Sequence, residues 1–193
     1  MPLTNKTFTL LALPLCAALT ACAADPQDDA DLVESDELPS ESSQALQSVP
    51  ESLAVPAGNH LGFWLPAKGV QIYKCALAAS GSYTWTFVEP EADLFGPFGK
   101  IVVGHHYVGP TWEAFDGSTV VASKVAGETV DATAIPWLLL KAVSNTGPGL
   151  MAKVTYIQRL YTVGGLAPST GCDADHAGAE ADVPYTATYT FYR

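Results

Sequence analysis

The chain has 193 residues, 48% of them hydrophobic, which is enough for one domain with a substantial core. Its formal net charge is −11, but nine acidic residues and no base lie between Asp25 and Glu51. From Ser52 onward eleven acids face eight bases, so this part is only mildly acidic. Basic side chains that neutralise phosphates supply most nucleic-acid affinity, so the composition argues against a nucleic-acid partner.

Residues 1–21 have the pattern of an export signal. Lys6 supplies positive charge, and residues 8–19 form an apolar segment too short to span a bilayer stably. The following Leu19-Thr20-Ala21-Cys22 resembles the lipobox of bacterial lipoproteins, in which the cysteine thiol receives a diacylglyceryl group before cleavage. The resemblance implies a mature chain that begins at lipidated Cys22. The alternative is an ordinary secretory peptide cut at Ala-x-Ala.

The lipobox resemblance also implies where the protein resides. Ala23, rather than Asp, follows Cys22, so the inner-membrane retention signal of enterobacterial lipoproteins is absent. We therefore expect an exported protein, anchored to the cell envelope by its lipid and in the outer membrane rather than the inner one. The rest of residues 22–54 is rich in acid, Ser, Gln and Pro, which predicts a disordered and extended linker.

Residues 55–193 alternate short apolar runs with turn residues, which is typical of an all-β domain. In chain order, strands are expected at residues 60–65, 70–77, 83–87, three within 100–121, and at 135–143, 152–163 and 185–193. Residues 89–93 should end the third strand, and 135–143 also suit a short buried helix because they are apolar on both parities. The domain is predicted to be a β-sandwich or barrel of about seven to nine strands.

The stretch from Lys100 to Val121 has the strongest local pattern in the domain. Its two apolar runs are separated by Gly109-Pro110 and end at Asp116-Gly117. This order predicts a β-meander: strand, Gly-Pro corner, strand, Asp-Gly hairpin and strand.

Six segments of the domain together resemble one known family. They are GVQIYKC (69–75), PEADLFGPFGK (90–100), GHHYVGPTWEAFDGS (104–118), IPWLLLKA (135–142), IQRLYTVGG (157–165) and VPYTATYTFY (183–192). They are similar to the domain-of-unknown-function family numbered 3455. The resemblance implies an exported bacterial or fungal protein with no agreed biochemical role. Some fungal members carry a malate dehydrogenase label, but this chain has neither GxGxxG nor a βαβ rhythm.

The histidines are the first candidates for chemistry. His105 and His106 are adjacent, so in a strand one should face inward and the other outward. His176 lies in a long loop with Asp173, and one of the paired histidines with these two residues would have ligand types suited to zinc or copper. The spacing matches no recognised metal motif. The alternative is a histidine bonded to a backbone carbonyl beside Trp112 and a solvated His176. No cofactor is expected, and the metal content stays unknown.

Cys75 and Cys172 form the domain's only cysteine pair. In an oxidising envelope such a pair favours a disulfide, which in the chain-entropy model is worth on the order of 4 kcal/mol. It would fix the loop at residues 164–184 to the strand that holds Cys75. The alternative is a buried free thiol at Cys75 and an exposed one at Cys172.

Three further residues could contribute to a binding site. Glu113 near Asp116 could mimic a glycosidase carboxylate pair, although Asp116 suits the turn better. Arg159 lies in an apolar strand, so it should either extend outward or pair with a carboxylate such as Glu91 or Asp93. Trp112 is predicted to be partly exposed, as in a cleft that binds glycans or peptides.

The sequence favours a lipid-anchored envelope protein with a non-catalytic domain that binds a ligand or partner, such as a glycan or a protein. Its site is expected at residues 104–116 together with the loop at 164–184. The alternative is a metal-dependent or hydrolytic enzyme with a site near His105, Glu113 and His176. A third class is a structural envelope domain without a small-molecule site.

Overall fold

The computed structural model describes residues 48–193. The predicted signal sequence, lipidated Cys22 and most of the acidic linker lie outside these residues. In the described part, no helix has the length and apolar character needed to cross a membrane.

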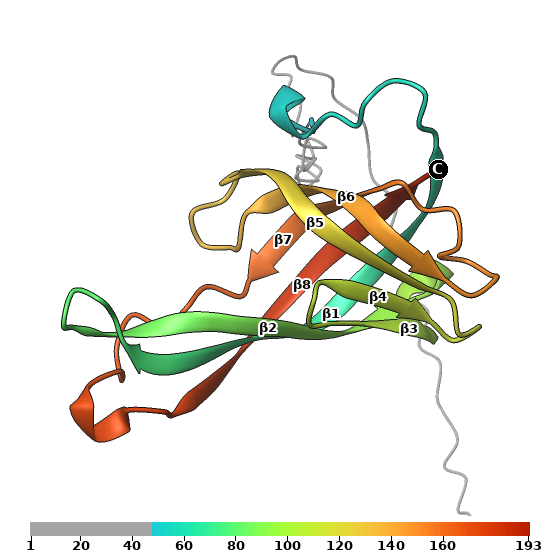
Figure 1. Cartoon of the computed structure of the whole chain (residues 1–193). Helices are drawn as coiled ribbons and strands as arrows, with labels where there is room; N and C mark the ends of the chain where they lie inside the picture. Colours follow the sequence, from blue (N-terminus) through green and yellow to red (C-terminus); the bar gives the residue numbers. More distant parts are fainter. Residues whose placement is uncertain (1–47) are drawn as a thin grey trace, which may run out of the picture. The chain divides into compact units, whose positions relative to one another are not determined.

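Eight antiparallel strands pair in chain order, and β8 pairs with β1 to close the sheet into a barrel (Figure 1). The strands are β1 Leu61–Leu77, β2 Tyr83–Phe95, β3 Val102–Tyr107, β4 Thr111–Ala114, β5 Thr119–Glu128, β6 Trp137–Thr146, β7 Tyr156–Gly164 and β8 Glu180–Tyr192. Three short 3-10 helices accompany them: η1 Glu51–Leu53, η2 Pro97–Gly99 and η3 Ala174–His176. The predicted all-β class is confirmed, and of the two architectures left open the chain adopts the barrel.

The first two strands are longer than predicted. β1 runs through Pro66 and Gly69, where two strands were expected, and β2 continues through Pro90, where the third strand was expected to end. Gly69 allows β1 and β2 to approach each other closely. A Cβ at this position would lie 2.0 Å from the carbonyl oxygen of Glu91 on β2, so only glycine leaves room for the continuous pairing. A bulge between Ile72 and Tyr73 interrupts the ladder close to Pro90, which is where a sheet tolerates proline.

The predicted meander is confirmed. β3 and β4 are joined at Gly109-Pro110, and β4 and β5 at Asp116-Gly117, with Gly117 at a φ of 81°. The Asp116 carboxylate accepts hydrogen bonds from the backbone and hydroxyl of Ser118 and from the backbone N–H of Leu150. The turn is thereby tied to the segment that follows β6. The segment at 135–143 is a strand rather than a helix, with β6 beginning at Trp137.

The barrel core is built from alternate residues of each strand. On β8 the predicted inward face, Tyr185, Ala187, Tyr189 and Phe191, is buried, as alternation in a strand requires. The alternate residues of β8, Thr186, Thr188 and Thr190, point outward.

A second cluster lies on the outer face of β6 and β7, where the segment of η1 covers it. It contains Leu53, Trp137, Leu139 and Leu160. Leu53 is fully buried, and its carbonyl accepts a hydrogen bond from Gln158 at 2.7 Å. The packed chain therefore reaches residues that the sequence analysis had placed in the linker before Val55.

The disulfide between Cys75 and Cys172 is present, as predicted. It connects β1 to the loop between β7 and β8, which is shorter than expected because β8 begins at Glu180. Two hydrogen bonds hold the same loop on the β1–β2 hairpin: Tyr73 donates to Gly165, and the Trp85 indole donates to Thr170. The loop is thus an ordered cover on one end of the long hairpin.

Candidate functional site

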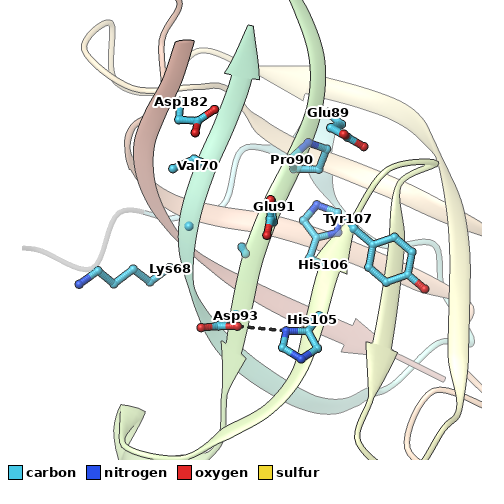
Figure 2. Close-up of a pocket in the computed structure, with 12 residues that line it drawn as sticks. Lys68, Val70, Glu89, Pro90, Glu91, Asp93, His105, His106, Tyr107 and Asp182 are labelled. Atoms are coloured by element: carbon cyan, nitrogen blue, oxygen red, sulfur yellow. Dashed lines mark hydrogen bonds and ion pairs between the residues drawn. The ribbon is translucent and has the colours of Figure 1, made fainter. Parts of the chain in front are cut away.

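An open groove of about 700 Å³ lies over β1, β2 and β3 (Figure 2). Glu89, Glu91 and Asp93 follow one another along β2 on its wall, with Asp182 of β8 nearby. Asp93 and the ring of His105 form a hydrogen bond of 3.0 Å, and both side chains are half exposed. The groove is therefore an acidic, solvated surface.

Glu113 belongs to the same outer row. The register places Asp93 opposite His105, and His105 opposite Glu113, across three neighbouring strands. Glu113 accepts a hydrogen bond from the Tyr107 hydroxyl at 2.8 Å, so its carboxylate is held on the outer surface. Within residues 48–193, no three His, Cys, Asp or Glu side chains are grouped so as to hold a metal ion.

The combined site of a paired histidine with Asp173 and His176 is not formed. His176 bonds Asp173 within its own loop, and Gly178 of that loop bonds the backbone of Cys75. Cys75 lies opposite Trp85 on β2. Trp85 is eight residues from Asp93, which separates these two residues by roughly 26 Å at about 3.3 Å per residue along a strand. Figure 1 shows η3 beyond one end of the β1–β2 hairpin, with β3 and β4 along the opposite part. The prediction that these residues share a site is therefore wrong.

His106 and Trp112 lie inside the barrel, where their rings stack with centroids 4.3 Å apart. Trp112 is 1% exposed, so the prediction that it is partly exposed is wrong. His106 faces inward and His105 outward, as predicted, and His106 Nδ1 donates to the carbonyl of Thr111 at 2.8 Å. Burial lowers the pKa of His106 to about 3, so its ring is neutral at physiological pH.

Arg159 also faces the barrel interior, because it shares its parity on β7 with the core residue Ile157. Its guanidinium donates from Nε and Nη2 to the carbonyl of Pro136, at 3.1 and 2.9 Å. Among the described residues no carboxylate forms an ion pair with it. The prediction that Arg159 extends outward or pairs with Glu91 or Asp93 is therefore wrong.

These inward-facing residues line a second cavity, of about 240 Å³, at one end of the barrel. All eight strands contribute to its wall. The polar part of the wall consists of Gln71, His106, Trp112, Lys124, Arg159 and Tyr189. The rest of the wall consists of Phe87, Val88, Pro90, Val108, Gly109, Pro110, Leu138 and Leu140. Phe87, Val88 and Val108 are about half exposed, which places them at its mouth.

Two buried polar atoms in this wall, Gln71 Nε2 and Trp112 Nε1, have no hydrogen-bond partner within residues 48–193. Gln71 is 3% exposed and Trp112 is 1% exposed, so bulk solvent does not reach these donors freely. Buried donors in native proteins are nearly always paired, and unpaired ones call for a specific explanation. Both donors belong to one small cavity that also holds an arginine without a carboxylate.

Burial raises the pKa of Tyr185 and of Tyr189, and the charge of Arg159 opposes that shift in both. The two hydroxyl oxygens lie 3.3 Å apart. Both phenols therefore remain protonated, and the polar side of the cavity carries several hydrogen-bond donors around the partly buried positive charge of Arg159.

His106, Trp112 and Arg159 were predicted from the sequence as candidate site residues, whereas Gln71, Lys124 and Tyr189, which line the same cavity, were not. Gln71 carried a usable signal, since it is a polar residue at the same parity as the inward-facing Tyr73. The sequence predicted one site formed by residues 104–116 and the loop at 164–184. These two segments lie in different parts of the molecule, so they do not form a common site.

Comparison with known proteins gives a family and no individual relative. The family described as protein of unknown function, DUF3455, matches residues 56–98 and 96–193. Neither a curated protein nor a solved structure has a significant match to the chain. The family match spans the barrel and agrees with the resemblance found in six sequence segments. The chain therefore belongs to the DUF3455 family of proteins of unknown function.

Proposed function

We propose that this protein is a lipid-anchored envelope protein whose barrel binds a small molecule in the cavity at its end. The observation that carries the proposal is the cavity of about 240 Å³ with two unpaired buried donors. Small-molecule sites in proteins are concave, largely apolar and contain a few polar groups that fix the ligand's orientation. Small barrels hold such ligands in their mouths.

The chemistry of the cavity supports binding rather than catalysis. His106 stacks on Trp112 and donates to a backbone carbonyl, and its pKa of about 3 leaves it a poor base at neutral pH. Burial raises the pKa of the Tyr189 phenol in the wall and that of Tyr185, whose hydroxyl lies 3.3 Å from it. The groups are held in place and suited to orienting a ligand, and we propose no reaction for them.

The anchor is tested separately, through Cys22. In a bacterial host that processes lipoproteins, the wild-type chain should incorporate labelled palmitate and sediment with membranes. Cys22→Ser should abolish both, while Cys75→Ser, which alters a domain cysteine, should retain the label. Equal labelling of wild type and Cys22→Ser would contradict the lipid anchor and leave the cavity proposal untouched.

The cavity is tested with a panel of neutral, anionic and cationic probes: benzyl alcohol, benzoate and benzylamine. The full chain carrying Cys22→Ser is labelled with ¹⁵N at its indole nitrogens, and the Trp112 signal is identified from its loss in Trp112→Phe. At least one probe should shift the Trp112 signal and leave that of Trp64, which is half exposed, in place.

A matched pair of variants locates the binding. Val108 lines the mouth and is 55% exposed, whereas Val143 is 62% exposed and does not line the cavity. Val108→Phe should prevent the Trp112 shift, and Val143→Phe should leave it unchanged. A panel in which no probe moves the Trp112 signal, or one in which both variants respond alike, would overturn the proposed site.

A further inference from the structure

We propose, on the basis of the proposed function, that the ligand of the barrel-end cavity is a small monocarboxylate with an apolar body. The structure supports this through three properties of the wall: its charge, its excess of donors and its size. Each property selects a different feature of the ligand.

The charge of the wall is positive. Arg159 and Lys124 line the cavity, and none of the fourteen described residues in the wall is Asp or Glu. His106 adds no charge because its ring is buried and neutral. Arg159 is partly buried and has no ion-pair partner among the described residues, whereas Lys124 is exposed. A partly desolvated cation without a counter-charge is unfavourable, and an anionic ligand supplies that charge. The same field would repel a cationic ligand.

The donors of the wall exceed its acceptors. Trp112 Nε1 and Gln71 Nε2 have no hydrogen-bond partner of good geometry among the described residues, although Gln71 lies near enough to the Tyr185 hydroxyl to lower its pKa. An indole N–H can only donate. A guanidinium has five N–H donors, and the bonds from Arg159 to Pro136 use only Nε and Nη2. An acceptor-only group such as a carboxylate, with two oxygens and about four lone-pair sites, complements this set.

The size and the opposite wall select the rest of the ligand. A cavity of about 150 Å³ lined by aliphatic and aromatic side chains can hold benzene. The present cavity of about 240 Å³ therefore has room for a ring or a short branched chain together with a carboxylate. Leu138 and Leu140 form an apolar surface for that body. A doubly charged phosphate needs several charge-assisted donors, and this wall supplies two cations.

The first experiment compares three isosteric probes, benzoate, benzamide and benzylamine, on the full chain carrying Cys22→Ser. Binding is measured by calorimetry, with the Trp112 indole signal as the indicator of location. Charge-assisted hydrogen bonds are about twice as strong as neutral ones, so benzoate should bind at least roughly tenfold more tightly than benzamide. Benzylamine and inorganic phosphate should bind more weakly than benzoate.

One variant tests the positive charge that sets this preference, and a second serves as its control. Arg159→Gln should weaken benzoate at least roughly tenfold and change benzamide by no more than about twofold, since only the anion uses the charge. Lys141→Gln removes one positive charge from an exposed position on β6 outside the cavity and should leave both affinities unchanged. Far-ultraviolet circular dichroism and thermal unfolding show whether each variant is folded.

Gln71→Glu keeps the shape of the side chain, removes the unpaired N–H donors and adds an internal carboxylate. It should abolish benzoate binding and spare benzamide, and it remains informative if Arg159→Gln fails to fold. A merely structural role for Gln71 would change the unfolding temperature without altering the ratio of benzoate to benzamide affinity.

The outcomes separate the two proposals. If benzamide binds as tightly as benzoate and shifts the Trp112 signal, the cavity is a ligand site but the carboxylate inference is overturned. If none of the probes shifts that signal, solvent alone satisfies the unpaired donors and the proposed function fails as well.

Discussion

The ring of His106 stacks on the indole of Trp112 inside the barrel, with centroids 4.3 Å apart and an interplanar angle of 13°. The neighbouring His105 faces outward and bonds Asp93. The two adjacent histidines therefore lie on opposite faces of β3. The inward one lines the cavity at the barrel end, where burial keeps its ring neutral at physiological pH.

The buried state of His106 predicts a pH dependence of stability. Burial lowers its pKa from 6.5 to about 3, so between these values the unfolded chain takes up a proton that the folded chain does not. Stability should therefore fall as pH decreases from about 6.5 towards about 3, with a slope of up to about 1.4 kcal/mol per pH unit from this group. His106→Phe should lose that contribution.

Urea unfolding at pH 7.5, 6, 5 and 4 measures this contribution. At pH 7.5 the phenylalanine variant lacks the hydrogen bond to Thr111 and should be less stable than wild type. The deficit should shrink or reverse by pH 4. A deficit that stays constant across the series would mean that His106 titrates normally in the folded protein.

The disulfide should contribute strongly to stability because it closes a long loop. Cys75 and Cys172 are 97 residues apart, and the chain-entropy model gives roughly 4 to 5 kcal/mol for a loop of about 100 residues. Cys75→Ala with Cys172→Ala should lower the free energy of unfolding by up to this amount. Wild type measured with a thiol reductant is the control and should fall by a similar amount. An unchanged free energy in both samples would contradict the account.

Leu53 should stabilise the barrel from outside. Its side chain is fully buried with Trp137, Leu139 and Leu160, and truncation of a buried leucine costs about 2 to 5 kcal/mol. Leu53→Ala should show a loss in this range by urea unfolding. Leu77→Ala is the matched control because Leu77 is 60% exposed, and its effect should stay within about 0.5 kcal/mol. Equal effects would mean that the η1 segment does not pack as described.

Asp116 and Asp131 each accept hydrogen bonds within a turn, and comparing them separates the effect of a long-range hydrogen bond from that of local ones. Hydrogen bonds from Ser118 and Leu150 lower the pKa of Asp116, and those from Thr133 lower the pKa of Asp131. Only Asp116 also bonds a residue distant in sequence, Leu150. Asp116→Asn should therefore lower the melting temperature at pH 7 more than Asp131→Asn does.

The pH dependence of this effect has a definite sign. Because the folded pKa of Asp116 is below 3.8, its stabilisation is present above about pH 4 and is lost as the pH falls through the folded value. The difference between wild type and Asp116→Asn should accordingly narrow at low pH. Equal melting temperatures for the two asparagine variants at pH 7 would show that the bond to Leu150 adds nothing.

Local sequence patterns predicted the parts of the fold that depend on local chemistry. Gly109-Pro110 and Asp116-Gly117 located two turns because these pairs favour turn geometry, and the alternation from Tyr185 to Phe191 identified an inward face. The disulfide was predicted from an even cysteine count in a chain that was expected to be exported. These inferences needed no knowledge of distant contacts.

The lengths of β1 and β2 and the position of the cavity depend on distant contacts. Pro66 and Pro90 are typical of strand ends, but the close approach at Gly69 and the bulge beside Tyr73 keep both strands continuous. Whether Arg159 faces solvent or the interior is decided by barrel closure, because alternation gives two faces without showing which is enclosed.

The most direct test of the account is a crystal structure of the protein soaked with 4-bromobenzoate. The anomalous signal of bromine locates the ring without reliance on any variant. We predict a bromine peak inside the barrel end near Leu138 and Leu140, with the carboxylate on the side of Arg159, Gln71 and Trp112. A peak confined to the outer groove beside His105 and Asp93, or an empty barrel end at saturating probe, would contradict the account.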